Sequence, residues 1–384
     1  MKEPKLRFPG YIDHLRTVTC GELFHERKEK GQEGLPILSL SIHTGISDHE
    51  LDDEESTKKV KRSEDKSLYK RVYPHDLAFN MMRAWQGAFG VSKVDGMISP
   101  AYIVASPSSE IDADYLDYYI QTDRFIGAAN SLSYGVTDFR KRLYWDSFCK
   151  IKIHLPSLSE QRKVADLLSM IDTVIEKQKA TVEGWEDRKK GVMQKLFSQE
   201  VRFKADDGSE FPDWEKKKLC NVLSYEQPTK YIVESTEYND KYDIPVLTAG
   251  QSLVLGYTNE KNGVYIASPT NPVIIFDDFT TSFHWIDFPF KVKSSAMKFL
   301  TLNDNDCNFL FVYNAMQVID YTPMSHSRQW ISTYSMFEIP YPCLAEQQKI
   351  ADCLSSLDDV IEKQKATLAA WEEMKKGLLQ QMFV

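Results

Sequence analysis

Apolar residues recur at alternating intervals of four and three along residues 158–197, and they do so again along residues 344–383. In each stretch eight of the ten positions at this spacing are apolar, and the exceptions are a glutamine and a lysine at matching places. Such a heptad pattern places apolar side chains in one seam along a helix, where they pack against another helix. Neither stretch contains proline, and the helix-favouring residues Ala, Leu, Glu, Lys and Gln dominate both. The sequence therefore predicts a coiled coil of two long helices, with a seam formed by Val164, Leu168, Ile171, Ile175, Gln178, Val182 and Trp185 in the first and by Ile350, Leu354, Leu357, Ile361, Gln364, Leu368 and Trp371 in the second.

The two helical stretches are copies of one sequence. Aligned without gaps, they are identical at 24 of 40 positions, and both contain the run IEKQKAT. A period this long is not that of a solenoid, so we expect two homologous halves that each end in the same helix. Two matching seams favour an antiparallel helix pair, with an internal pseudo-two-fold axis, over two helices that each lie on a domain core. In that pairing Gln178 and Gln364 are expected to meet near the axis and to set the register.

Each helix follows a segment of about 150 residues, the length of one domain. The two segments begin alike, with LRFPGY and SEFPDW, and both end in an alternating strand pattern that stops at a proline. Between these ends their sequences do not match. Runs such as PAYIVAS and NPVIIFDD predict strands and Asp112–Thr122 predicts a helix, so both segments are expected to be mixed α/β domains. We therefore predict an α+β protein in four parts: a domain at 1–157, a helix at 158–197, a domain at 198–343 and a helix at 344–384.

Composition and motifs narrow the function. The chain is 42% hydrophobic and 12% aromatic, as folded domains are, and its apolar runs are too short to span a bilayer. The first thirty residues lack the apolar core of a secretory signal, and the six cysteines form no CxxC pair, so we expect a cytoplasmic protein with free thiols. The sequence lacks nucleotide-binding, methyltransferase, zinc-protease and serine-hydrolase motifs, and its histidines show no metal-ligand spacing, which predicts a chain without catalytic or metal sites. Asp277 and Asp278 are adjacent, and since neighbours on a strand face opposite sides, we expect a turn there rather than a catalytic pair.

Basic residues supply the remaining chemical signal. The net charge of −9 argues against a nucleic-acid-binding protein, but DNA responds to local patches rather than to a sum over the chain. Lysine and arginine cluster in KKVKRSEDKSLYKR, DFRKRLYW, FKVKSSAMK and SHSRQW. Basic side chains on loops make the phosphate and base contacts of DNA-binding domains, although ordinary surface charge would give the same clusters. The candidate DNA contacts are Lys58, Lys59, Lys61, Arg62, Arg140, Lys141, Arg142, Lys291, Lys293, His326 and Arg328.

The repeated pattern PxLxEQxKxAxxLSxxDxxIEKQKA, placed after each domain, resembles the specificity subunits of type I restriction-modification systems. Ser67–Val104 and the region from PVIIFDDF to SSAMKFL resemble the two target-recognition domains of that family. The resemblance implies that each domain reads one half of a bipartite, asymmetric site in double-stranded DNA, and that the antiparallel helices separate the halves. It implies as partners two methyltransferase subunits, which methylate adenine at N6 with S-adenosylmethionine, and motor-nuclease subunits, which require ATP and Mg²⁺. This chain would then be a non-catalytic subunit that binds no cofactor itself.

A second hypothesis is a coiled-coil adaptor that does not bind DNA and presents two ligand-binding domains. The repeat and the net charge fit this adaptor equally well, whereas two unlike domain interiors on one scaffold fit it less well. Exchanging one domain separates the hypotheses, because only a specificity subunit would change a DNA target. The missing motifs disfavour a stand-alone methyltransferase or nuclease.

Overall fold

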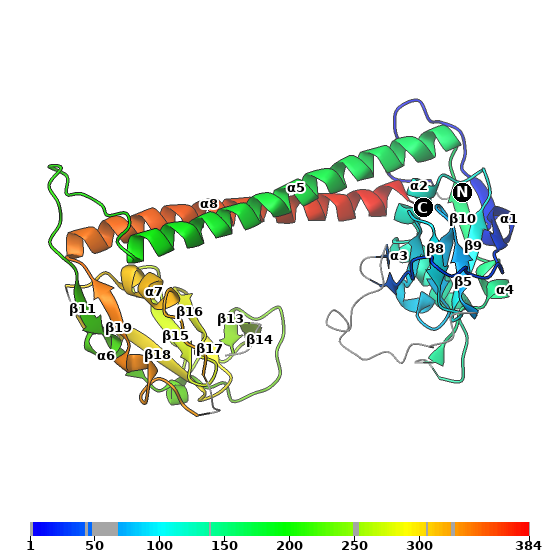
Figure 1. Cartoon of the computed structure of the whole chain (residues 1–384). Coiled ribbons are helices and arrows are strands. Elements are labelled where there is room, and N and C mark those ends of the chain that lie inside the picture. The colour runs from blue at the N-terminus through cyan, green and yellow to red at the C-terminus, as the bar shows by residue number, and fades with distance from the viewer. Residues whose placement is uncertain are drawn as a thin grey trace. The chain divides into compact units, whose positions relative to one another are not determined.

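The structure, a computed structural model, describes residues 3–42, 45–47, 68–137, 140–248, 253–304, 306–323 and 327–383. The chain forms two compact units: unit 1 consists of residues 1–180 and 365–384, and unit 2 of residues 181–364. Each unit contains one globular domain and part of both long helices, which are labelled α5 and α8 in Figure 1.

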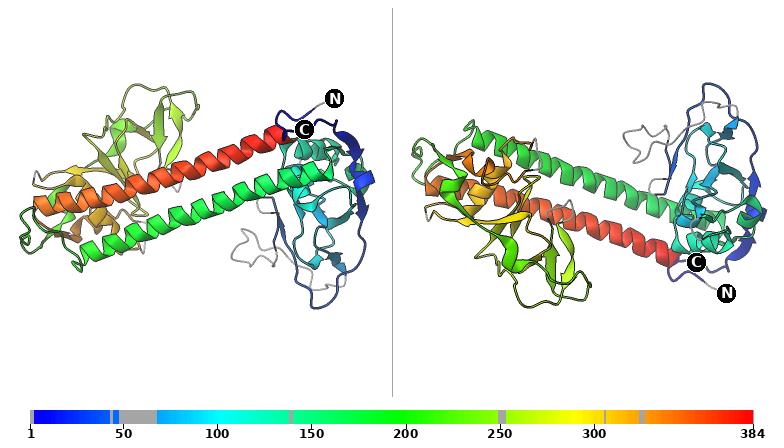
Figure 2. Two further views of the ribbon diagram at one scale, coloured as in Figure 1. Left: turned by 90° about the horizontal axis from the view of Figure 1, so that it is seen from above. Right: turned by 90° about the horizontal axis from the view of Figure 1, so that it is seen from below.

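The two long helices are present as the heptad pattern predicts. α5 comprises Leu158–Phe197 and α8 comprises Leu344–Met382, and Figure 2 shows them side by side. In unit 1 Lys375 Nζ lies 2.6 Å from Asp172 Oδ1, and in unit 2 Lys189 Nζ lies 2.6 Å from Asp358 Oδ1. The two ion pairs are equivalent under the repeat, because the two aspartates and the two lysines each lie 186 positions apart. These ion pairs explain why a lysine interrupts each apolar seam.

The ends of the long helices pack into the domain cores. Val164, near the start of α5, shares the core of unit 1 with Phe383, which follows α8. Ile350, near the start of α8, shares a core of unit 2 with Phe197, the last residue of α5. The start of each helix therefore lies beside the end of the other within each unit, so the pair is antiparallel. The helix ends also lie on domain cores, so pairing of the helices and packing on a core, which were alternatives in the sequence, both occur.

The domain of unit 1 is built on a four-stranded antiparallel sheet with the strand order β2-β9-β6-β7. Its first strand, β1, pairs antiparallel with its last, β10. The helix predicted near Asp112 is α2, and Asp112 caps it by accepting hydrogen bonds from the amides of Asp114 and Tyr115. The strands are β1 (Arg16–Thr19), β2 (Phe24–Glu26), β3 (Leu40–Ser41), β4 (Gly45–Ile46), β5 (Lys70–Val72), β6 (Leu77–Asn80), β7 (Phe89–Val91), β8 (Gly96–Ile98), β9 (Tyr102–Pro107) and β10 (Lys152–Leu155), and the helices are α1 (Cys20–Leu23), η2 (Ala84–Gln86), α2 (Ala113–Tyr119), α3 (Asp123–Leu132) and α4 (Trp145–Phe148).

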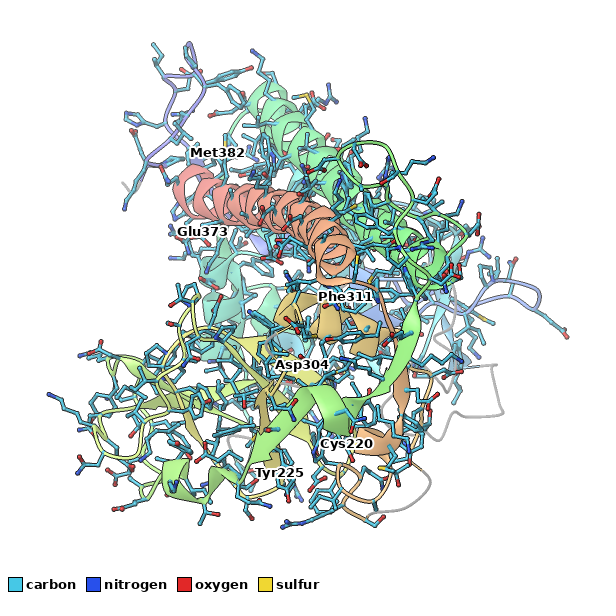
Figure 3. The ribbon with its side chains drawn as sticks, turned by 90° about the vertical axis from the view of Figure 1, so that its left-hand side faces the viewer. Cys220, Tyr225, Asp304, Phe311, Glu373 and Met382 are labelled. Carbon is cyan, nitrogen blue, oxygen red and sulfur yellow. The ribbon has the colours of Figure 1, made fainter. Side chains whose placement is uncertain are left out.

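The domain of unit 2 has a four-stranded antiparallel sheet with the order β12-β18-β15-β16, and a smaller sheet with the order β14-β13-β17. Its first strand, β11, pairs antiparallel with its last, β19. Phe311 of α7, labelled in Figure 3, packs on Phe197 of α5 with ring centroids 5.6 Å apart. The strands are β11 (Glu215–Lys218), β12 (Leu223–Glu226), β13 (Ile244–Leu247), β14 (Val254–Thr258), β15 (Val273–Asp277), β16 (Phe283–Ile286), β17 (Lys291–Val292), β18 (Met297–Leu302) and β19 (Glu338–Tyr341), and the helices are α6 (Leu219–Val222), η4 (Pro228–Tyr231), α7 (Phe309–Gln317) and η5 (Tyr334–Met336).

The main sheets of the two domains share one topology although the central sequences of the domains do not match. In each, the first strand pairs with the last, a short helix follows the first strand, and the next strand begins the four-stranded sheet. The order β2-β9-β6-β7 corresponds strand by strand to β12-β18-β15-β16. The arrangement of the main sheet therefore repeats although the central sequences do not, because many apolar sequences with the same alternation fit one place in a sheet.

A buried glutamate at the start of each long helix fastens the helix to its domain. Glu160 Oε2 lies 2.7 Å from Arg7 Nη2, and Glu346 Oε2 lies 2.8 Å from Arg202 Nη2. Trp214 Nε1 also donates a hydrogen bond to Glu346, at 2.8 Å. The two glutamates are 3% and 0% exposed, so each carboxylate depends on its arginine for charge compensation.

The neighbouring glutamine repeats in the same way. Gln161 accepts a hydrogen bond from the amide of Asp112, and Gln347 accepts one from the amide of Asn308, which caps α7. Each side-chain nitrogen donates to the carbonyl of the proline that precedes its helix. These bonds explain why the Glu-Gln pair is identical in both copies although neither residue belongs to the apolar seam.

Candidate nucleic-acid interface

Two loops carry exposed arginines at equivalent places in the two domains. The Arg140 loop, defined as residues 133–137 and 140–144, lies between α3 and α4 in unit 1. The Arg328 loop, defined as residues 318–323 and 327–333, lies between α7 and η5 in unit 2. Arg140, Arg142 and Arg328 are all exposed. Each loop precedes the short last helix and the closing strand of its domain, so the two loops occupy matching places in the order of elements.

The Arg140 loop has aromatic residues on both sides of its arginines. The backbones of Tyr134 and Arg142 exchange hydrogen bonds of 3.1 and 2.9 Å, which fold the loop back on itself. The rings of Tyr134 and Tyr144 lie 5.1 Å apart. Gly135 is required here, because a Cβ at this position would lie 2.2 Å from the carbonyl oxygen of Arg140. The loop lines an open hollow of about 750 Å³ formed by Met82, Tyr134, Gly135, Val136, Arg140, Lys141, Arg142 and Tyr144.

This hollow combines the features that nucleic-acid sites use. Tyr134 is 60% exposed and Val136 is 95% exposed, which leaves apolar and aromatic surface beside two exposed guanidinium groups. Arginine can bind phosphate or donate two hydrogen bonds to guanine, and an aromatic face can contact a sugar or a base. The arginines were predicted from the sequence and the two tyrosines were not, although the tyrosines flank the basic run in SYGVTDFRKRLYW.

The Arg328 loop is held from behind by buried groups. The amide of Gln329 donates to the carbonyl of Asp278 at 2.8 Å, and the amide of Trp330 donates to Asp278 Oδ1 at 2.8 Å. Trp330 is 2% exposed and packs with its ring 5.1 Å from that of Phe276. Burial raises the pKa of Tyr334, which stacks on Trp330. The loop thus exposes its arginine while the two following residues are buried.

Each arginine loop is attached to the same hairpin turn of its domain. In unit 1 the amide of Leu143 donates to the carbonyl of Met81, which follows β6. In unit 2 the amide of Gln329 donates to the carbonyl of Asp278, which follows β15. Strands β6 and β15 hold equivalent places in their sheets. The predicted turn begins at Asp278, directly after Asp277 ends β15, and Asp277 Oδ1 accepts a hydrogen bond from the amide of Phe279 in this turn.

The other candidate contacts are placed as follows. Lys293 is half-buried, with Nζ 5.8 Å from the ring centre of Tyr238, and Lys141 is half-buried in the Arg140 loop. The prediction that Lys291 contacts DNA is corrected, because the Lys291 side chain is 3% exposed and pairs with Glu260 at 2.8 Å. Lys291 therefore cannot reach DNA. Five candidates lie outside the described residues: Lys58, Lys59, Lys61, Arg62 and His326.

No residue of the predicted seam is exposed. The buried members are Val164, Leu168, Ile171, Ile175, Val182, Ile350, Leu354 and Ile361, and the half-buried members are Gln178, Trp185, Leu357, Gln364, Leu368 and Trp371. The meeting of Gln178 with Gln364 stays a prediction. Within the described parts of the chain, no cluster of three or more His, Cys, Asp or Glu side chains could hold a metal ion. A search of the same parts for a long apolar helix that could cross a membrane finds none.

The chain is similar to known proteins of one kind. Residues 212–370 match the family described as the type I restriction modification DNA specificity domain. The EcoR124I/EcoR124II specificity subunit of Escherichia coli is 47% identical over 154 residues, which cover 39% of this chain and 38% of that protein. The MjaVIII specificity subunit of Methanocaldococcus jannaschii is 24% identical over 315 residues, which cover 74% of this chain and 72% of that protein.

Two solved structures share the fold over nearly the whole chain. The type I restriction-modification S subunit from M. genitalium has a TM-score of 0.54 and 15% identity, and the match covers 100% of this chain and 99% of that one. A chain from another type I R-M system has a TM-score of 0.53 and 13% identity, with 98% and 99% coverage. These likenesses confirm the predicted architecture of α/β domains joined by long helices.

Proposed function

We propose that this chain, which carries a type I restriction modification DNA specificity domain at residues 212–370, is the non-catalytic subunit that selects the DNA sequence for a type I restriction-modification complex. The observation that carries the proposal is the pair of exposed arginine loops, which occupy equivalent places in two domains of one topology. A repeated scaffold with two different loops is suited to reading two different half-sites. The target is then bipartite and asymmetric.

The internal repeat fits the symmetry of double-stranded DNA. Dimeric DNA-binding proteins use a two-fold axis to present two reading elements to two half-sites. Here one chain supplies both elements, and the Arg140 and Arg328 loops differ in sequence, so the half-sites need not be identical. The repeat also supplies two equivalent surfaces, which is consistent with two copies of a methyltransferase partner.

The remaining roles belong to partner subunits. We infer that two methyltransferase subunits use S-adenosylmethionine to methylate adenine at N6, and that motor-nuclease subunits use ATP and Mg²⁺ to cut unmodified DNA in the cytoplasm. With a net charge of −9, this chain alone should bind DNA weakly and in a salt-sensitive way. The adaptor hypothesis receives no support from the comparisons, in which the matching curated proteins are specificity subunits.

Replacing Arg140 or Arg328 with alanine should relax the base preference at one position of one half-site. The expected loss is about tenfold, because a bidentate contact between arginine and guanine supplies roughly 1–3 kcal/mol of discrimination. The measurement is methylation of a randomised site library by the complex with its methyltransferase partner. Arg162→Ala, an exposed arginine on α5, is the matched control and should leave the preference unchanged. Equal weakening on all sequences would reduce either loop arginine to a phosphate contact.

The long helices should determine the number of unread base pairs between the half-sites. A helix of 40 residues is about 60 Å long, and seven added residues lengthen it by about 10 Å while keeping the heptad seam. Inserting one heptad beside Thr181 and another beside Thr367 should therefore lengthen the unread gap by about three base pairs, at 3.4 Å per pair. The methylated motif of the variant gives the gap directly. An unchanged gap in a folded, active variant would refute this role of the helices.

A further inference from the structure

A buried ion pair in unit 2 lies behind the Arg328 loop. Lys298 Nζ is 3.2 Å from Asp278 Oδ2, and the two side chains are 0% and 1% exposed. Lys298 lies on β18 opposite Phe276 of β15, and Asp278 directly follows β15. Neither charged atom makes a hydrogen bond of good geometry to another described residue. Burying two charges is costly, and a buried pair is often no more stabilising than apolar residues of similar volume.

Asp278 connects this ion pair to the Arg328 loop. One carboxylate oxygen faces Lys298, and the other accepts the hydrogen bond from the amide of Trp330 at 2.8 Å. The carbonyl of Asp278 accepts from the amide of Gln329, and its amide donates to the carbonyl of Ala296 at 3.0 Å. The Asp278 side chain therefore links Lys298 to the backbone of the Arg328 loop through its two carboxylate oxygens.

Unit 1 builds the same place without charge. Met81 directly follows β6 and so takes the place that Asp278 has after β15. Ile103, which lies opposite Phe79 of β6, takes the place of Lys298, which lies opposite Phe276 of β15. The Arg140 loop is attached there through the carbonyl of Met81. Because the same topology forms with Met81 and Ile103, the fold does not require the ion pair.

We propose that Asp278 and Lys298 are a positioning pair, which sets the placement of the Arg328 loop for reading one half-site. This inference rests on the proposed function. The pair does not contact DNA itself. It acts through Gln329 and Trp330, the two residues that follow Arg328. A direct base contact requires its side chain to be held in place by such supporting bonds, since a small displacement of a reading residue weakens discrimination before it weakens folding.

The test replaces both members of the pair with the residues of unit 1, as Asp278→Met with Lys298→Ile, in the complex with the methyltransferase partner. A single substitution would leave a buried charge unpaired and destabilise the domain, so the double variant is used. On a randomised site library, discrimination at the half-site read by the Arg328 loop should fall about tenfold, as for the loss of one base contact. Discrimination at the other half-site should not change.

A second ion pair, in which Lys291 is buried and Glu260 is half-buried, provides the control. Glu260→Gln with Lys291→Met removes a charged pair from unit 2 whose hydrogen-bond partners lie in residues 234–262, and it should leave both half-site preferences intact. If hydrogen exchange shows that the variant with Asp278→Met and Lys298→Ile is not folded, the conservative replacement is Asp278→Asn with Lys298→Gln. The same loss of discrimination is expected for it. Full discrimination in a folded variant overturns the positioning role. A wild-type complex that modifies no bipartite site overturns the proposed function itself.

Discussion

The Arg202→Ala variant is expected to lose about 3–5 kcal/mol of unfolding free energy in unit 2. Arg202 is the cation that compensates Glu346, whose carboxylate is fully buried at the start of α8. Without Arg202, the buried carboxylate of Glu346 keeps only the hydrogen bond from Trp214. Removing one partner of a buried ion pair destabilises a protein by about 3–5 kcal/mol because it leaves a buried charge uncompensated. Denaturant titration of the whole chain, with hydrogen exchange at β11 and β19, measures the effect.

Two further variants make the Arg202 result specific. Arg16→Ala removes an arginine whose partner, Glu110, is half-exposed, so solvent already screens the pair and stability should change little. Combining Arg202→Met with Glu346→Gln removes both charges and should recover a large part of the loss, because no unpaired charge stays buried. A single variant as stable as wild type would contradict the assignment of Glu346 as the anchor of α8.

Phe383→Ala is expected to destabilise unit 1 by about 3–4 kcal/mol. Phe383 is 8% exposed, and its ring lies 5.1 Å from that of Tyr115 and 5.7 Å from that of Tyr119, both on α2. Truncation removes buried apolar surface and leaves a cavity beside α2, which gives losses of this size for phenylalanine in a core.

Hydrogen exchange of α2 and of β1 with β10 would report the loss caused by Phe383→Ala. Met374→Ala, a change of an exposed side chain on α8, should be close to neutral and is the control. Equal exchange rates in wild type and the Phe383 variant would show that the end of α8 does not support the core of unit 1.

The coiled coil could be predicted in detail because its signal is local and repeated. The heptad positions, the antiparallel pairing and the lysines that interrupt the seam are all in the sequence, and an identical stretch appears twice. The ion partners of those lysines could not be predicted without the register, since Asp172 and Asp358 lie outside the seam. The sequence showed the Glu-Gln anchors only as residues identical in both copies. The role of the two glutamates depends on Arg7 and Arg202, which are distant along the chain.

The candidate interface was less accessible from the sequence. Exposed and buried lysines look alike in a basic run, so Lys291 was included although Glu260, 31 residues earlier, neutralises it in the interior. The arginine loops fell among the predictions because they carry basic residues beside aromatic ones. The equivalence of the two loops was not predicted, because it follows from a shared topology that the central sequences do not reveal. The contacts of Arg140 and Arg328 with DNA stay predictions.

The most direct test of the proposed function is a genome-wide map of N6-methyladenine in the native cell with and without this gene. If the chain selects the target, methylation should disappear from one bipartite, asymmetric motif and return when the gene is restored. If the methyltransferase partner is present and active and no motif changes, the chain does not select the methylated sequence, and the DNA-recognition account is contradicted.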